Sequence, residues 1–374
     1  MYIYKEKRMQ PTFKIVLGLA LFFQTALCAM DVGPGAERPR YQYAVWQHIG
    51  GRRTQEDAFC CQLGLTNPVC GVFDGHGVPG VGAQVSQFAA DNMPTFFDQA
   101  CKDGKEVAPA LDHALAEIEK RSREPQAGES WTQFDPDAGS TAVVMGINAQ
   151  DYAYIKNVGD SECMILDRVE DKSRSGYVMR CCTRNHRPYQ RDEAERVFKV
   201  GGKVEYCDLT TTAWKMRLYK QARNWAELPE NFANKPWEYH CAVAGPEQDS
   251  STLAITRALG DSYFKKYGVI AEPESLKPQK IDDNSLVLLM SDGVTDAFTD
   301  DEIAQKITHL MRATDIEHYR AFKGPGSLAG NNERLKNVVR VLGDLVLQQR
   351  MGDNVTLMLV EKAKNHAGEN HDEK

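Results

Sequence analysis

Residues 141–169 read TAVVMGINAQDYAYIKNVGDSECMILDRV, and this stretch decides the fold. It holds three β-rich runs, at 141–147, 152–158 and 163–169, which are joined by links of a few residues. Parallel strands need crossover connections of about a dozen residues or more, so such short links predict antiparallel hairpins. A Rossmann-type parallel sheet is therefore excluded.

The same patterning continues along the chain, and neither an internal repeat nor a long linker interrupts it. Alternation predicts further strands at 41–48, 69–73, 177–183, 286–290 and 355–360. Helical periodicity predicts helices at 81–100, 107–123, 192–200, 301–311 and 332–349. The fourth helix has a capping box, with Thr299 as N-cap and Glu302 three residues later.

These elements predict one α+β domain over residues 30–362. The stretch at about 205–250 is aromatic and polar without clear periodicity, and we interpret it as an insertion or flap. Residues 363–374 are polar, and a disordered tail is expected there.

The composition is that of an ordinary globular protein: of 374 residues, 42% are hydrophobic and 26% are charged. A wholly disordered chain, a collagen and a multi-span membrane protein are excluded. The formal net charge is −7, so the basic surface that nucleic acid requires is missing. No nucleic-acid partner is expected.

The first 29 residues have a different character from the rest. Lys5, Lys7, Arg8 and Lys14 precede an apolar run at 15–23, and small residues follow at 25–29. This order is typical of a secretory signal peptide, and the run is shorter than the roughly 20 apolar residues of a membrane span. A buried amphipathic helix and an uncleaved signal anchor are the alternatives.

Cleavage would leave a chain that is secreted or lies in the secretory pathway, with no membrane attachment. It would remove four basic residues and one acidic residue, which takes the net charge from −7 to −10. An oxidising compartment would permit disulfides among the ten cysteines, whose pairing the sequence does not specify.

Carboxylates recur where predicted strands begin or end. The segments are RRTQED at 52–57, DGHG at 74–77, NVGDS at 157–161, SDGVTD at 291–296 and DN at 353–354. Each alone is more often a turn or a solvated strand end. If the segments converge, their carboxylates repel one another unless divalent cations neutralise them. An all-oxygen set favours Mg²⁺, Mn²⁺ or Ca²⁺ over zinc, as in two-metal hydrolysis.

Taken together, the segments resemble the metal-dependent protein serine/threonine phosphatases of type 2C. The resemblance covers about residues 41–361. Seven motifs stand in the family's order: RRTQED at 52–57, DGHG at 74–77, GSTA at 139–142, NVGDS at 157–161, RALGD at 257–261, SDG at 291–293 and DN at 353–354.

The resemblance implies a four-layer α-β-β-α sandwich of two antiparallel sheets flanked by helices, with two Mn²⁺ or Mg²⁺ ions per subunit in a cleft at one end. Asp74 would bridge the ions, and the Gly75 carbonyl would bind one of them. The other positions implied at the metals are Asp292 and Asp353 on the second ion, Glu56 and Asp57 beside metal-bound waters, and Asp160 and Asp296 at a third, weaker ion.

The resemblance also implies a reaction. Water activated between two metal ions would hydrolyse phosphoserine or phosphothreonine in proteins directly, without a phosphoenzyme. Arg52 would hold the substrate phosphate, and His76 would protonate the departing oxygen. A monomer is expected.

Two departures from the family pattern stand out. The segment usually reading Asp-His-Lys-Pro is Asn185-His186-Arg187-Pro188 here, and Val78 replaces a glycine after DGHG. The first of these positions is not a metal ligand in the family, so we expect activity to survive. Val78 is followed by Pro79, and together they are expected to restrict the loop.

Three alternative functions are also considered. A catalytically silent phosphatase-like binding module is the main alternative, although it commonly lacks one of these carboxylates. A nuclease or other two-metal hydrolase would want a basic surface. A calcium-stabilised structural protein would show no turnover.

Overall fold

The computed structural model describes residues 40–78, 80–123, 135–170, 175–209, 219–235, 239–245, 252–313, 326–349 and 352–363. The expected signal peptide at 1–29 and residues 364–374 of the expected tail lie outside these ranges. Within them, no helix has the length and apolar character needed to span a membrane.

The first of two large sheets has six strands, all paired antiparallel. In spatial order they are β17 (Gly326–Gly330), β1 (Tyr41–His48), β18 (Val355–Lys362), β16 (Ser285–Met290), β7 (Glu162–Glu170) and β8 (Ser175–Cys182). The first and last strands of the described ranges are therefore neighbours in this sheet, because β1 lies directly beside β18.

The second large sheet is also antiparallel. Its order is β13 (Leu259–Gly260), β4 (Gly139–Ser140), β3 (Val69–His76), β5 (Ala142–Ile147), β6 (Tyr152–Val158) and β14 (Glu274–Ser275). β2 (Asp57–Gln62) pairs with β3, and β15 (Gln279–Lys280) pairs with β6.

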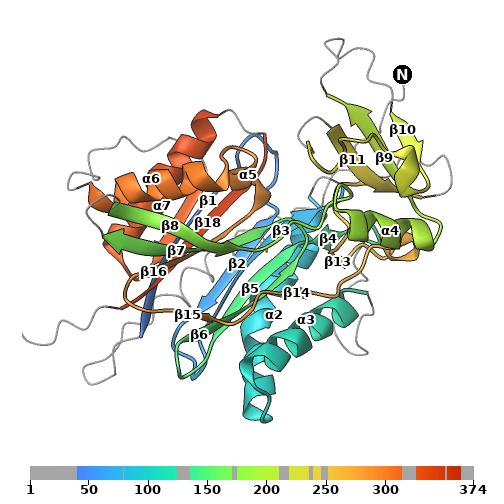
Figure 1. Ribbon diagram of the computed structural model, residues 1–374. Coiled ribbons are helices and arrows are strands. Elements are labelled where there is room, and N and C mark those ends of the chain that lie inside the picture. Colours follow the sequence, from blue (N-terminus) through green and yellow to red (C-terminus); the bar gives the residue numbers. More distant parts are fainter. Residues whose placement is uncertain are drawn as a thin grey trace, which may run out of the picture.

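The two sheets pack face to face, as the α+β sandwich prediction required. Alternate residues such as Val45, Met145 and Leu289 point from both sheets into one apolar core. On the outer face of the first sheet lie α5 (Asp292–Thr295), α6 (Asp300–Arg312) and α7 (Glu333–Gln348). On the outer face of the second lie α2 (Gly82–Lys102) and α3 (Val107–Arg123) (Figure 1).

One of the two predicted hairpins is wrong. β5 and β6 form the expected hairpin, but β7 pairs with β16 and β8 in the other sheet. The edge of β6 away from β5 is taken by β14 and β15, so β7 cannot add there. The link at 159–161 carries the chain between sheets, and Gly159 makes the sharp turn with φ +103°.

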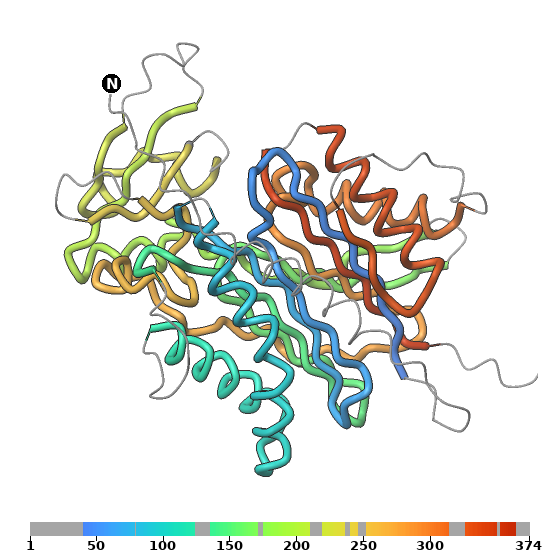
Figure 2. Tube along the Cα trace, turned by 180° about the vertical axis from the view of Figure 1, so that it is seen from behind, coloured from blue at the N-terminus to red at the C-terminus, as the bar shows by residue number. Residues whose placement is uncertain are grey.

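A third, smaller sheet stands apart from the sandwich at the end where β3 and β4 finish (Figures 1 and 2). Its strands are β10 (Lys220–Ala222), β9 (Lys203–Asp208), β11 (Tyr239–Ala244) and β12 (Thr252–Leu253), in that order. α4 (Arg191–Lys199) and the short 3₁₀ turn η2 (Trp225–Glu227) pack against it around Phe232. The described parts of the predicted flap at 205–250 thus belong to a small β-sheet with its own core.

One local prediction and one question that the sequence left open can be compared directly with the structure. The capping box is confirmed: Thr299 accepts a hydrogen bond from the Glu302 amide, and the Glu302 carboxylate accepts one from the Thr299 amide. The cysteine pairing that the sequence left open is also visible. Cys61 and Cys70 are cross-strand neighbours on β2 and β3, and they form a disulfide.

Candidate active site

The site begins where β2 and β3 lie side by side. Asp57 opens β2 and lies directly opposite Asp74 on β3. The Asp57 side chain accepts hydrogen bonds at Oδ2 from Ser291 Oγ (2.8 Å) and Thr356 Oγ1 (2.7 Å). Ser291 follows β16 and Thr356 lies in β18, so Asp57 joins the ends of both sheets.

The electrostatics show that the predicted carboxylates converge. Burial raises the pKa of Asp74 well above its ordinary value, and the negative charges of Asp57, Asp292, Asp160 and Asp353 raise it further. Burial likewise raises the pKa of Asp57 to about 6 and that of Asp292 well above normal. Carboxyl groups from five segments therefore share one poorly solvated region, where they oppose each other's ionisation.

Three observations fit divalent cations at this place. Asp57 Oδ1 and Asp292 Oδ1 are buried and have no hydrogen-bond partner. At Gly75, an added Cβ would lie 2.5 Å from the Gly82 carbonyl oxygen and 2.6 Å from that of Glu56, so only glycine fits. The converging side chains offer oxygen ligands alone, which Mg²⁺ and Mn²⁺ prefer.

Arg52 lies at the rim of the acidic cluster. Its Nη2 is 2.6 Å from Asp353 Oδ2, and its side chain is 52% exposed. The hydrogen bond to Asp353 raises the pKa of Arg52, and Asp74 and Asp292 raise it further. The guanidinium can thus reach solvent while staying beside the carboxylates, the position that a phosphate-binding fork needs.

Glu56 is held by the backbone around it. Its Oε1 accepts a hydrogen bond of 2.5 Å from the Gly80 amide, and burial raises its pKa. Asn354 fixes the loop that carries both Arg52 and Glu56. Its Oδ1 accepts from the Glu56 amide (2.8 Å), and its Nδ2 donates to the carbonyls of Ile49 (2.8 Å) and Thr54 (3.0 Å).

His76 ends β3 and pairs with a carboxylate that the sequence prediction left without a role. Its Nε2 lies 2.6 Å from Asp261 Oδ2, and the Asp261 side chain is 1% exposed. Burial lowers the pKa of His76, but the neighbouring Asp261 outweighs it, and the net direction is upward. Gly139 makes the pairing possible, because a Cβ there would lie 2.0 Å from Asp261 Oδ2.

The remaining predicted ligands surround an arginine. Arg187 Nε donates to Asp160 Oδ2 at 2.7 Å, and its Nη2 donates to Asp292 Oδ2 at 3.1 Å. Asp296 Oδ1 lies 3.9 Å from the same Nη2. The negative charge of Asp160 is the largest influence raising the pKa of Arg187.

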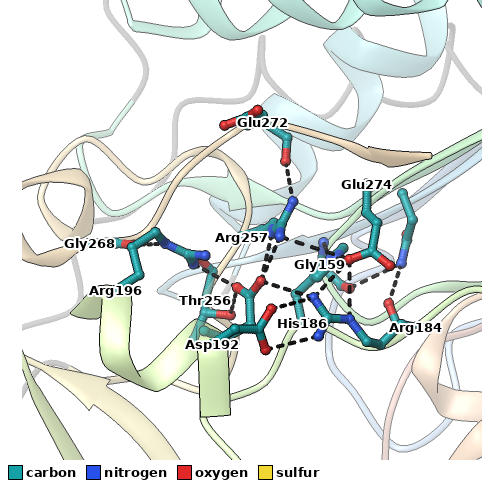
Figure 3. Close-up of polar contacts among 12 residues, drawn as sticks. Gly159, Arg184, His186, Asp192, Arg196, Thr256, Arg257, Gly268, Glu272 and Glu274 are labelled. Atoms are coloured by element: carbon teal, nitrogen blue, oxygen red, sulfur yellow. Dashed lines mark hydrogen bonds and ion pairs between the residues drawn. The ribbon is translucent and has the colours of Figure 1, made fainter. Parts of the chain in front are cut away.

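A second, buried ionic cluster holds this arginine's segment in place. Glu193 of α4 is fully buried and accepts hydrogen bonds from Arg196, Thr256 and Arg257. Figure 3 shows these donors converging next to His186, whose ring faces Gly159. The cluster joins α4 to the second large sheet, because Arg184 donates both to Asp192 of α4 (2.9 Å) and to Glu274 of β14 (2.8 Å).

No three of the carboxylates predicted as ligands lie close enough together, in the described ranges, to bring their oxygen atoms within 4.8 Å of one another. In the described ranges, the one trio of His, Cys, Asp or Glu with ligand atoms mutually within 4.8 Å is Glu162, Cys182 and Asp300. Cys182 and Asn185 already hydrogen-bond Glu162, which accounts for that trio as a polar contact.

Sequence reasoning missed three functional contacts. Asp261 was noted as the last residue of RALGD but received no role, although its place in that motif was a usable clue. Arg187 was treated as a neutral departure, yet it lies among the carboxylates. Asn354 was noted beside Asp353 without its part in holding the loop.

Comparison with known proteins identifies this arrangement. The family model for protein phosphatase 2C matches residues 41–355. A mouse protein described as probable protein phosphatase 1N is 29% identical over 286 residues, covering 72% of this chain and 56% of the mouse protein. Probable protein phosphatase 2C 69 of Arabidopsis thaliana is 28% identical over 308 residues, covering 80% of this chain and 71% of its own length.

Solved structures support the fold. A Caenorhabditis elegans sex-determining protein superimposes with a TM-score of 0.60 at 21% identity, covering 93% of this chain and 71% of that chain. The serine-threonine phosphatase 2C of Toxoplasma gondii gives a TM-score of 0.57 at 18% identity, covering 88% and 96%.

Proposed function

Since this chain belongs to the protein phosphatase 2C family, we propose that it is a metal-dependent protein serine/threonine phosphatase that uses two metal ions. The observation that carries the proposal is the set of mutually repelling carboxylates around Asp74, with free oxygens on Asp57 and Asp292. The chain spans 56% of its mouse relative, so activity and substrates are proposals for the protein as a whole.

The residues divide into three roles. Asp57, Asp74, the Gly75 carbonyl, Asp292 and Asp353 would hold two Mn²⁺ or Mg²⁺ ions, with Glu56 orienting water beside them. When bound, these ions supply a water of lowered pKa and positive charge for the phosphate oxygens. A phosphoserine or phosphothreonine side chain on a protein is the substrate.

The chain's own side chains would orient the phosphate and protonate the leaving group. Arg52, half exposed at the rim, would bind two oxygens of the phosphate with its planar fork. His76 would donate the proton on Nδ1, the ring nitrogen that does not face Asp261, to the departing serine or threonine oxygen. Asp261, 2.6 Å from Nε2, accepts a hydrogen bond there, which favours the protonated ring and fixes its direction.

The test is phosphate release from a phosphothreonine peptide in Mn²⁺, in Mg²⁺ and in EDTA, beside Asp292→Asn. The matched control is Asp283→Asn, because Asp283 is exposed and precedes the same strand that Asp292 follows. We expect metal-dependent release that Asp292→Asn loses and Asp283→Asn keeps. Absence of release from folded wild-type protein in either metal would contradict the proposal and favour the binding-module reading.

The proposed location is the secretory pathway or the exterior of the cell. The basic and apolar order of residues 1–29 and the Cys61–Cys70 disulfide both support it, because such bonds persist in oxidising compartments. N-terminal sequencing of protein isolated from its native cell should find a start near residue 30. Only untrimmed cytosolic protein beginning at Met1 would overturn it.

A further inference from the structure

Arg187 lies where a third cation would otherwise be needed. Its guanidinium bridges Asp160 and Asp292 at 2.7 and 3.1 Å and lies 3.9 Å from Asp296. Asp160 and Asp296 are the two positions that the family resemblance assigned to a weak third ion. In this structure they already face a fixed positive charge.

The position of Arg187 is fixed by the backbone around it as well as by the contacts of its side chain. The residue before Arg187 and the residue before Asp160 are tied together by two hydrogen bonds. The His186 amide donates to the Gly159 carbonyl (3.0 Å), and the Gly159 amide donates to His186 Nδ1 (3.1 Å). Figure 3 shows this pairing next to the buried ionic cluster. The backbone therefore brings Arg187 and Asp160 together.

Burial makes the pairing persistent. The side chains of Asp160 and Arg187 are 6% and 26% exposed, and His186 is fully buried. A guanidinium stays charged at every pH that a folded protein tolerates, and its planar fork can serve two carboxylates at once. A lysine, the usual residue at this position, would offer one point charge on a flexible stem.

We propose that Arg187 takes the place of the third metal ion, so that the chain binds two divalent ions and no third. The proposal rests on the proposed function, because it concerns the same carboxylates. Arg187 occupies Asp292 Oδ2 and leaves Oδ1 without a hydrogen-bond partner, so Asp292 can serve an ion on one oxygen while the guanidinium orients the other. A divalent ion between Asp160 and Asp296 would lie against a neighbouring positive charge.

The experiment counts bound Mn²⁺ on the full chain by equilibrium dialysis, with the free Mn²⁺ signal in electron paramagnetic resonance as a second readout. Wild type should saturate at two ions per chain up to millimolar Mn²⁺. Arg187→Met should gain a third, weak ion, and adding Asp160→Asn to it should remove that ion again. Arg191→Met is the control for lost charge, because Arg191 lies on the nearby helix with its side chain 68% exposed and pairs with Glu195.

The outcomes separate the two proposals. Three ions on wild type, or an unchanged count in folded Arg187→Met, would overturn the role of Arg187. Should Arg187→Met fail to fold, Asp160→Asn alone decides the matter: an unchanged count of two supports the role, and a count that falls from three overturns it. No bound ion on wild type would refute the proposed function itself.

Discussion

Glu193 should stabilise the protein more than any exposed carboxylate on its helix. Its side chain is 0% exposed, yet Arg196, Thr256 and Arg257 donate to it at 2.6 Å. Burial raises its pKa, but these donors outweigh burial and lower the pKa to about 2. Replacing Glu193 with Gln removes the charge while keeping the shape.

The size of the effect follows from the pKa. A fall from 4.5 to about 2 corresponds to about 3 kcal/mol of stability at pH 7. Breaking a buried ion pair while its arginines remain costs roughly 3–5 kcal/mol, which agrees. We therefore expect Glu193→Gln to lower the free energy of unfolding by about 3 kcal/mol.

The pH dependence has a definite sign. Because the folded pKa of Glu193 lies below its unfolded value, the contribution is complete above about pH 5 and is lost as the pH falls towards 2. The difference between wild type and Glu193→Gln should therefore shrink by about half between pH 7 and pH 3.

Urea unfolding at pH 7 and at pH 3 measures both quantities, with amide hydrogen exchange in α4 as a local readout. Glu195→Gln is the matched control, because Glu195 lies on the same helix, is 51% exposed and pairs only with exposed Arg191 among the ion pairs described. It should change stability by less than about 1 kcal/mol. A loss below about 1 kcal/mol for Glu193→Gln, or a loss independent of pH, would refute the reasoning.

Three further predictions concern the site and a helix end. Asp261→Asn should slow release from a phosphoserine peptide at least about tenfold, and by no more than the ~10²–10⁴-fold that a general acid supplies, because Asp261 acts only through His76. It should spare p-nitrophenyl phosphate, whose leaving group needs no proton. Equal losses on both substrates would contradict a role through His76. Metal-free protein should lose stability as the pH rises through about 6, because the pKa of Asp57 is raised in the folded state. Bound Mn²⁺ should abolish that loss, and thermal unfolding at pH 5 and pH 7.5 with and without Mn²⁺ measures it. Thr299→Ala should cost about 1 kcal/mol by removing the N-cap of α6, seen as a lower urea midpoint with an unchanged m-value.

Local patterns account for most of the elements. β1 and β6 begin and end where alternation predicted, and α3 also matches its predicted range. β2 was missed because Cys60 and Cys61 interrupt its alternation, and every residue but the last is buried. Two strands of the small sheet, β10 and β12, were missed because they have only three and two residues, too few to show a period.

The sequence by itself determined the family and the order of the carboxylate segments, and the family resemblance in turn implied the two-sheet sandwich. The motifs and the periodic burial patterns each lie within a short stretch of chain, so they can be recognised without knowledge of the tertiary structure. The tertiary structure alone decided which sheet β7 joins, because that depends on β14 and β15, over 100 residues later, covering the edge of β6. It also decided that Asp261 meets His76 and that Arg187 meets Asp160, across 185 and 27 residues. Such charge contacts carry no periodicity, since they arise only when the backbone has brought distant turns to one end of the sandwich.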